Sequence, residues 1–140
     1  TKAVPEDGAW RISGTKIFIT HGDQDMTENV IHLVLARTPG APEGTKGISL
    51  FIVPKFNVEQ TGKLGTRNDL RVVSLEHKLG HMASPTAVMS YGDNDGATGF
   101  LLGEENFARG DGGRGRVVGW WRRRENVRDV SCPTKTPYNV

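Results

Sequence analysis

The sequence of 140 residues contains one cysteine, Cys132, so the chain cannot form an intrachain disulfide. Because disulfides persist mainly in oxidising compartments, we expect a cytoplasmic protein. No apolar run approaches the ~20 residues that a membrane-spanning helix needs. The first eight residues do not have the shape of a signal peptide and do not begin with methionine, which predicts a piece of a longer protein.

Aromatic residues are scarce, at 7% of the sequence, and apolar residues make up only 36%, whereas glycine occurs 18 times. This composition is more typical of a β-rich domain with many turns than of a helical bundle. The length suffices for one domain with a core, and not comfortably for two. The net charge of +2 excludes a strong attraction of the whole chain to nucleic acid or membranes.

Charge is distributed unevenly, because residues 107–140 carry eight basic and three acidic side chains. Within them, "ARGDGGRGR" and "VVGWWRRREN" have neither the period of a strand nor that of a helix. Arginine beside aromatic rings is one way to hold single-stranded nucleic acid, so a nucleic-acid-binding β-domain is our alternative function. We favour a frameshifted or otherwise artefactual origin, which predicts an irregular, disordered and functionless basic tail.

Seven segments have the composition of β strands, and glycine, proline or polar residues separate most of them. These are residues 10–13, 16–20, 30–36, 48–53, 70–75, 84–91 and 100–102. We expect a hairpin turn at Gly14–Thr15, and burial of both faces of 30–36 because nearly all its residues are apolar. Pro54 should end the fourth segment, and Pro85 restricts the sixth to a strand start or an edge.

The chain before residue 106 contains no helical periodicity longer than two turns and no internal repeat. We therefore predict an all-β fold, a small antiparallel β-barrel or sandwich over residues 1–106, followed by the basic tail at 107–140.

The segment "KIFITHG", residues 16–22, holds the first candidate site. Alternate residues of a strand share a face, which predicts Phe18 and Thr20 on one side and Ile17 and Ile19 on the other. The two isoleucines are readily interpreted as core. An aromatic ring beside a hydroxyl could instead face water, a loop or a ligand.

Four stretches in order carry a resemblance: "DGAWRISGTKIFITHG", "LVLARTPGAPEGTKGISLFIVPKF", "EHKLGHMASPTAVMSYG" and "GFLLGEEN". Together they resemble the middle β-domain of the acyl-CoA dehydrogenase family, with the order and spacing of that family. The similarity is greatest to the large bacterial branch, which acts on short or sulfur-containing acyl-CoA thioesters. It covers roughly residues 1–106.

The resemblance implies a fragment of an FAD-dependent enzyme in which this β-domain lies between two helical domains. The whole enzyme would remove the α-proton of an acyl-CoA and pass the β-hydrogen to flavin N5 as hydride. An electron-transfer flavoprotein would take the electrons, and the parent enzyme would form dimers or tetramers. The catalytic base would lie outside this chain, so we expect the isolated fragment to be inactive.

The resemblance also implies that Phe18, Ile19 and Thr20 bind FAD, with Phe18 in the place of the tryptophan usual in the family. A planar flavin ring needs an aromatic neighbour and a few placed polar groups, which this pattern supplies. The phenylalanine retains the aromatic wall but lacks the indole N–H. Without the resemblance, Phe18 would be interpreted as core and Thr20 as an ordinary strand residue.

The loop at residues 40–46 is the second candidate, since the resemblance places it near the CoA moiety. Its glycines expose backbone N–H groups, and Thr45 and Lys46 could contact the polar parts of CoA. A mobile surface loop is an equally good interpretation.

The remaining polar residues predict no separate site. The four histidines, His21, His32, His77 and His81, lack the spacing of a metal site, and we interpret them as exposed or satisfied. Cys132 is a poor nucleophile candidate. The hydroxyls of 84–86 are expected to satisfy backbone groups at a strand entry.

Overall fold

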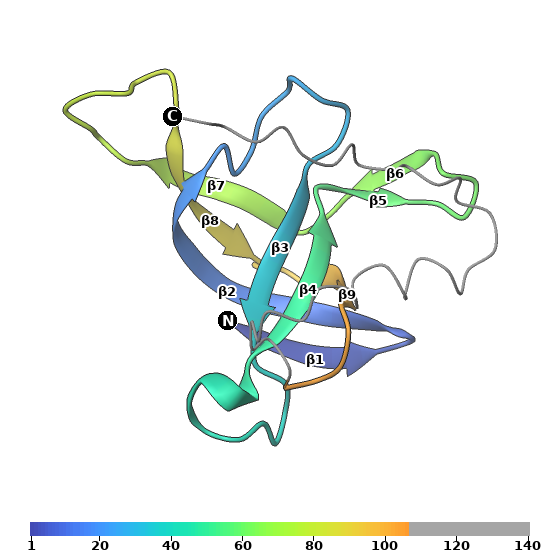
Figure 1. Ribbon diagram of the computed structural model, residues 1–140. Helices are drawn as coiled ribbons and strands as arrows, with labels where there is room; N and C mark the ends of the chain where they lie inside the picture. The colour runs from blue at the N-terminus through green and yellow to red at the C-terminus, as the bar shows by residue number, and fades with distance from the viewer. Residues whose placement is uncertain (107–140) are drawn as a thin grey trace, which may run out of the picture.

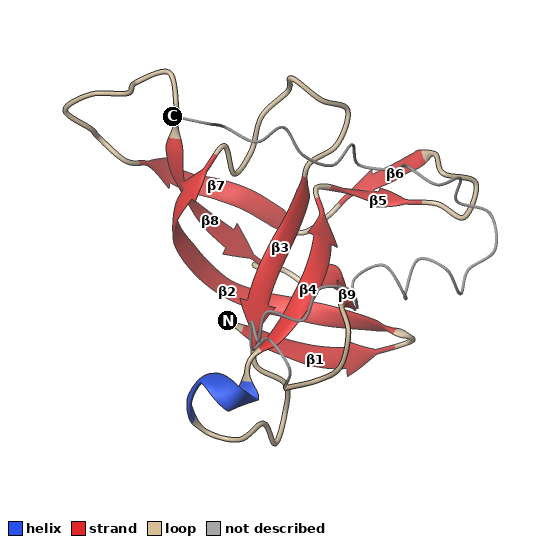
Figure 2. Cartoon of the chain, in the orientation of Figure 1, coloured by secondary structure: helices blue, strands red, loops and turns tan. Residues whose placement is uncertain are grey.

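The computed structural model describes residues 1–106 of the chain. Within them, every regular element except one short 3-10 turn is a β strand (Figure 2). The strands are β1 (Lys2–Glu6), β2 (Ala9–Thr20), β3 (Ile31–Ala36), β4 (Ser49–Pro54), β5 (Phe56–Val58), β6 (Leu64–Arg67), β7 (Leu70–Leu75), β8 (Thr86–Tyr91) and β9 (Ala97–Leu101). The 3-10 turn η1 spans Gly44–Gly47. The predicted all-β class is confirmed. Residues 1–106 contain no helix long and apolar enough to cross a membrane.

The strands pair in the order β3-β4-β9-β2-β8-β7, always antiparallel, and β1 adds to β2. Figure 1 shows the sheet curling, so that β3 and β4 lie in front of β2, β7 and β8. A single parallel bridge between Lys2 and Arg37 connects β1 to the end of β3, and the Ala3 N–H donates to the Arg37 carbonyl at 2.8 Å. The sheet thus nearly closes into a barrel, while β5 and β6 form a separate hairpin.

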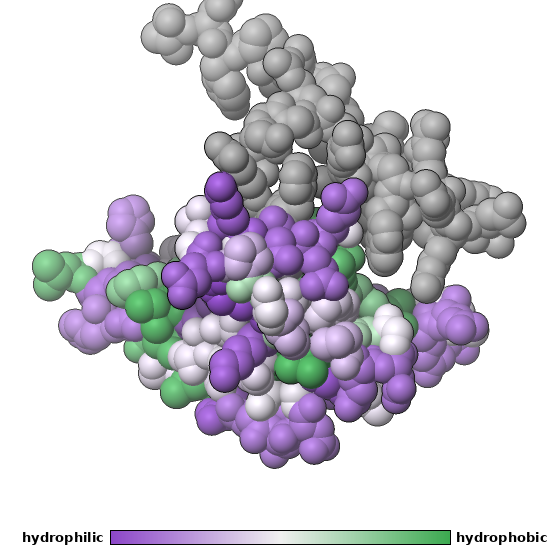
Figure 3. All heavy atoms as spheres, turned by 90° about the horizontal axis from the view of Figure 1, so that it is seen from below, coloured by the Kyte–Doolittle hydropathy of each residue, from purple (hydrophilic) through white to green (hydrophobic). Residues whose placement is uncertain are grey.

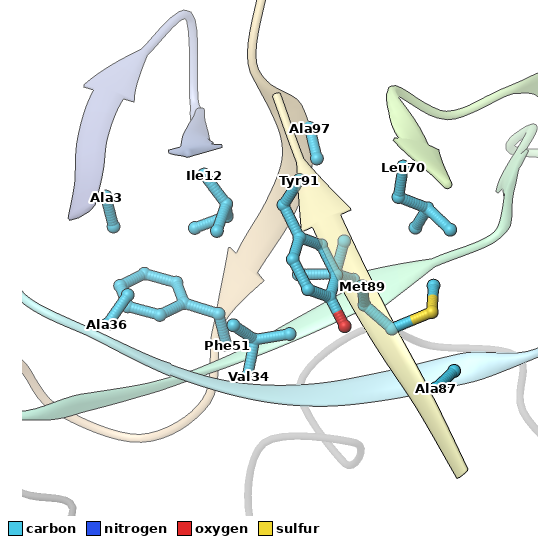
Figure 4. Close-up of a cluster of buried hydrophobic side chains, with 11 residues drawn as sticks. Ala3, Ile12, Val34, Ala36, Phe51, Leu70, Ala87, Met89, Tyr91 and Ala97 are labelled. Atoms are coloured by element: carbon cyan, nitrogen blue, oxygen red, sulfur yellow. The ribbon is translucent and has the colours of Figure 1, made fainter. Parts of the chain in front are cut away.

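The core lies between the front and back strands and is filled by side chains that alternate inward (Figure 4). Ile12, Phe51 and Met89 are fully buried, and the Trp10 ring packs on Phe51 with centroids 5.3 Å apart. Burying a side chain of this size contributes about 1.5–3 kcal/mol to stability. These contacts join β2, β4 and β8, which fixes where the remaining edges of the barrel lie.

The hairpin predicted at Gly14–Thr15 is wrong, because β2 runs through this pair without a turn. The chain turns instead at Asp7–Gly8, where φ is +46° and +79° and Glu6 pairs with Ala9. An Asp-Gly loop of two residues with positive φ matches the twist of antiparallel strands. Gly14 serves close packing: a Cβ there would lie 2.9 Å from Thr1 Cα.

The predicted burial of both faces of 30–36 is also wrong. β3 alternates between exposed and buried residues, with Ile31, Leu33 and Leu35 exposed. β3 pairs with β4 on one side only and therefore lies at the edge of the sheet. Its outward-facing side chains remain exposed within the described residues. Figure 3 shows hydrophilic residues over most of the face seen from below, with hydrophobic residues scattered between them.

A β-bulge interrupts the expected alternation in β2. Lys16 pairs with Met89 and Ile19 with Ala87, so Ile17 and Phe18 together occupy the place of one residue. Ile19 packs against the core while Ile17 is 57% exposed, so the prediction of two core isoleucines is wrong for Ile17. Because a bulge depends on the partner strand, the alternation within β2 does not reveal it.

The flanking strand β7 has a bulge of its own in its pairing with β8. Val72 pairs with Met89 and Ser74 with Val88, which leaves Val73 as the extra residue. Val73 is exposed. This bulge accounts for the imperfect alternation of 70–75, a segment whose predicted bounds match β7.

Candidate functional site

An open groove of about 370 Å³ lies between the second half of β2 and the edge strand β3. It is lined by residues of β2 and the loop after it, by residues of β3 and the one before it, and by one residue of β8: Lys16, Ile19, Thr20, His21, Gly22, residues 30–35 and Tyr91. Most of these side chains are apolar, with a few polar groups between them. This is the composition of many ligand-binding clefts.

A buried hydrogen bond between His32 and Tyr91 joins β3 to β8 at this groove. The Tyr91 hydroxyl lies 2.7 Å from His32 Nδ1, and the two rings meet edge to face. Burial raises the pKa of Tyr91 to about 12, so the phenol remains protonated at neutral pH. The phenol can therefore donate to a neutral imidazole whose other nitrogen carries the proton.

His32 is 7% exposed, and the Nε2 atom of its ring forms no hydrogen bond with the described residues. Burial lowers the pKa of His32, and Lys55 adds to this, whereas Asp23 and the Gly22 backbone oppose it. The neutral form is therefore favoured. The sequence analysis interpreted His32 only as exposed or as having its hydrogen bonds satisfied. The sequence signal for its position at the groove is that it is a histidine inside an otherwise apolar strand.

The bulge places an aromatic ring at the surface beside the groove. Phe18 has a φ of +61° and is 69% exposed. A bulky residue in the left-handed region is strained, and such strain concentrates at functional sites. Thr20, two residues further on, is exposed. Ile19 and Thr20 line the groove, whereas Phe18 lies outside its lining.

The loop after Thr20 is held by an ion cluster. Asp23 pairs with Lys55 at 2.5 Å and with Arg67 at 2.8 Å, and Lys55 Nζ also donates to the Gln24 carbonyl. Burial would raise the pKa of Asp23, but the bonds from the two cations prevail and lower it. The carboxylate therefore stays charged and fixes the end of the groove that His21 and Gly22 form.

Thr45 and Lys46 lie in η1, which comes after β3 at the end opposite to the loop after Thr20 (Figure 1). Arg37 organises this loop by donating to the Pro42 carbonyl at 2.7 Å and to the Gly44 carbonyl. Both candidate residues are exposed. The structure does not bring them together with residues 18–20.

Hydrogen bonds to the backbone hold the segments around the site. The Pro85 carbonyl accepts from the His21 N–H at 2.9 Å, and the Thr86 carbonyl accepts from Glu76. Asn29 bonds the backbone of Val30 and Phe56, which fixes where β3 begins. No three potential metal ligands gather anywhere in residues 1–106.

Curated proteins similar to this chain are acyl-CoA dehydrogenases. The chain is 63% identical over 105 residues to the 3-methylmercaptopropionyl-CoA dehydrogenase of Ruegeria pomeroyi, covering 74% of this chain and 17% of that protein. It is 46% identical over 106 residues to a butyryl-CoA dehydrogenase of Syntrophomonas wolfei, with the same coverage of each. The chain thus spans 17% of the length of these curated relatives.

The fold also matches solved structures. A probable acyl-CoA dehydrogenase from Mycobacterium abscessus superimposes with a TM-score of 0.52 and 26% identity, covering 75% of this chain and 24% of that one. No family model matches the chain. The comparisons give no support to the nucleic-acid alternative, and the basic tail that suggested it lies outside the described residues.

Proposed function

Because this chain belongs to the acyl-CoA dehydrogenase family, we propose that it forms one wall of the flavin and substrate site of such an enzyme. The parent protein would carry out α,β-dehydrogenation of an acyl-CoA thioester. FAD, when bound, would supply the acceptor for the hydride at its N5 atom. The residues of this chain would bind, orient and shield that group.

The bulge in β2 is the observation that carries this proposal. It turns the Phe18 ring outward in a strained conformation, two residues before the exposed Thr20. A planar flavin ring fits an exposed aromatic wall with few polar groups around it. Phe18 would cover part of the ring and exclude water, while Thr20 would donate a hydrogen bond to its polar edge.

Thr45 and Lys46 would contact the CoA part of the substrate. Lys46 supplies a positive charge, and η1 exposes backbone groups in a loop that Arg37 holds in place. The separation of this loop from residues 18–20 suits a long ligand, whose reacting end and polar end lie far apart. This assignment rests on the chemistry of the loop.

The general base would come from outside the described residues, since no carboxylate lines the groove between β2 and β3. We propose an electron-transfer flavoprotein as the electron acceptor and a homodimer or homotetramer for the parent protein. A cytoplasmic location remains the expectation from the single cysteine.

Flavin binding by the parent protein tests the assignment of residues 18–20. Phe18→Ala and Thr20→Val should each raise the Kd for FAD by roughly threefold to tenfold, because each removes one contact of about 0.5–1.5 kcal/mol. The measurement is FAD titration of the apoprotein, monitored by flavin fluorescence. Thr15→Val is the matched control, since Thr15 is also on β2 but lies on the other side of the bulge.

Equal affinity in Phe18→Ala, Thr20→Val, Thr15→Val and the unchanged protein would contradict the flavin assignment. Thermal unfolding of each apoprotein must be unchanged, which separates a lost contact from a misfolded domain.

A further inference from the structure

Two residues in the last part of β2 and the loop after it have strained backbone conformations. Phe18 has a φ of +61° and His21 a φ of +52°, so both lie in the left-handed region. Such conformations persist only where the surrounding structure holds them. Thr20, which we propose to bond the flavin, lies between these two residues. Its position therefore depends on the contacts that hold residues 18–22.

The segment is held against the core and on the side of β8. Gly22 is buried, and a Cβ at this position would lie 2.7 Å from Met89 Sδ and 3.1 Å from Ile19 Cγ2. The His21 N–H donates to the carbonyl of Pro85, the residue directly before β8, at 2.9 Å. These contacts leave the side that faces β3 to be held by another group.

His32 of β3 is that group. The Tyr91 ring extends from β8 into the core (Figure 4), and its hydroxyl lies 2.7 Å from His32 Nδ1. Because Nδ1 of the neutral ring accepts this bond, Nε2 carries the proton. Burial lowers the pKa of His32, whereas the Gly22 backbone raises it, as an acceptor beside an imidazole does.

The Nε2 atom is buried without a bond of normal geometry in the described residues. A buried donor without a partner costs free energy, so the ring favours the arrangement in which the Gly22 carbonyl approaches Nε2. Tyr91, His32 and Gly22 line the groove together with Thr20. A line of contacts thus runs from β8 through β3 to the residues directly after Thr20.

We propose that His32, oriented by the Tyr91 hydroxyl, is a positioning residue whose Nε2–H holds the Gly22 carbonyl and thereby fixes where Thr20 lies. His32 contacts no ligand in this arrangement and acts through the backbone. Its effect on the flavin rests on the proposed function, whereas its hold on residues 20–22 does not.

Amide exchange in the 140-residue chain tests the hold on this segment. Tyr91→Phe keeps the ring but removes the hydroxyl that orients the imidazole. Exchange of the His21 amide should become about threefold to tenfold faster, as expected for the loss of one hydrogen bond. Amides of residues 10–13, in the first half of β2, are the internal reference, because a general loss of stability would affect them equally.

Ser49→Ala is the matched control. It also removes a buried hydroxyl, which accepts from the Asn106 N–H at 2.8 Å, but at the opposite end of β4 from Val53, the partner of His32. Faster exchange at His21 than at residues 10–13, in Tyr91→Phe and not in Ser49→Ala, supports the proposal. Unchanged exchange at His21, or an equal change at both places, would overturn it.

Two substitutions of His32 itself separate the hydrogen bond from the packing of the ring. His32→Leu removes the donor and should speed exchange at His21 as Tyr91→Phe does. His32→Gln retains a side-chain N–H in the place of Nε2 and should keep the protection. Equal exchange in the two variants would show that the donor plays no part.

The parent protein saturated with FAD tests the effect on the flavin. The rate of flavin reduction by acyl-CoA would be compared in Tyr91→Phe, Thr20→Val and the double variant. Tyr91→Phe should slow reduction by about threefold. It should add nothing in the Thr20→Val background, because the contact that it positions is already lost. Additive effects would contradict a route through Thr20.

Failure of this proposal can be distinguished from failure of the proposed function. An unchanged rate in Thr20→Val would contradict the flavin assignment, while the exchange result would still decide whether His32 holds the segment. A slower Thr20→Val together with an unchanged Tyr91→Phe would overturn the positioning role alone.

Discussion

The two halves of β2 differ in how they are held, although they belong to one strand. Its first half pairs with β1 on one side and β9 on the other, and buries Ile12 against Phe51. Packing there is tight, since a Cβ on Gly99 would lie 2.9 Å from Ile12. The second half pairs with β8 alone, contains a bulge and exposes Phe18.

This difference separates a scaffold end of the barrel from the end at which we propose that the ligand binds, the proposed binding end. Residues paired on both sides cannot move without breaking two ladders of hydrogen bonds, so they fix the position of the second half of the strand. The strained bulge and open edge persist because this scaffold holds them. The same division predicts which substitutions affect stability and which affect ligands.

The largest expected effect is at the scaffold end. Phe51→Ala should destabilise the domain by about 3–5 kcal/mol, because it removes a fully buried ring and the packing partner of Trp10. Phe100→Ala on the neighbouring strand is the matched control, since Phe100 is 40% exposed and should cost less than half as much. Urea unfolding measures both. Equal losses of unfolding free energy in the two variants would contradict this prediction, because burial would then not decide the cost.

A smaller change in the free energy of unfolding should come from His32 at the proposed binding end, and this change should depend on pH. The pKa of His32 is lowered by burial, with Lys55 acting in the same direction and Asp23 and the Gly22 backbone opposing. The unfolded chain therefore binds the proton at higher pH than the folded chain. Stability contributed by neutral His32 is fully present above about pH 6.5 and falls as pH drops below it.

Unfolding free energies at several pH values between about 8 and 5 measure this loss. His32→Gln should flatten the decline over this range, because glutamine does not titrate. Tyr91→Phe serves as a comparison that removes the hydrogen bond and leaves the histidine. A decline of the same slope in His32→Gln and in the unchanged chain would assign the pH dependence to other groups.

The sequence predicted the all-β fold because its apolar segments are short and separated by turn residues. The residues of β7 matched their prediction, and those of β4 lay within one residue of it. The Asp7–Gly8 turn carried a recognisable local signal, but the turn was assigned to Gly14–Thr15 instead. The short strands β5 and β6, which contain polar residues and glycine, had no clear strand pattern.

The groove could not be predicted, because it is formed by the unpaired edges of two strands whose pairing partners are not apparent from the sequence. The bulge at Ile17–Phe18 likewise depends on the register with β8. The resemblance nevertheless pointed to residues 18–20, and two of them line the groove. The roles of these residues and of Thr45 and Lys46 stay predictions.

The rate of flavin reduction in the parent protein tests the central claim most directly, namely that the second half of β2 faces the flavin. Anaerobic stopped-flow mixing with acyl-CoA would compare Thr20→Val, Thr20→Ser and the unchanged protein, each saturated with FAD. We predict that Thr20→Val slows reduction by about threefold to tenfold, the value of one hydrogen bond, while Thr20→Ser retains the rate. Identical rates in all three proteins would contradict the claim.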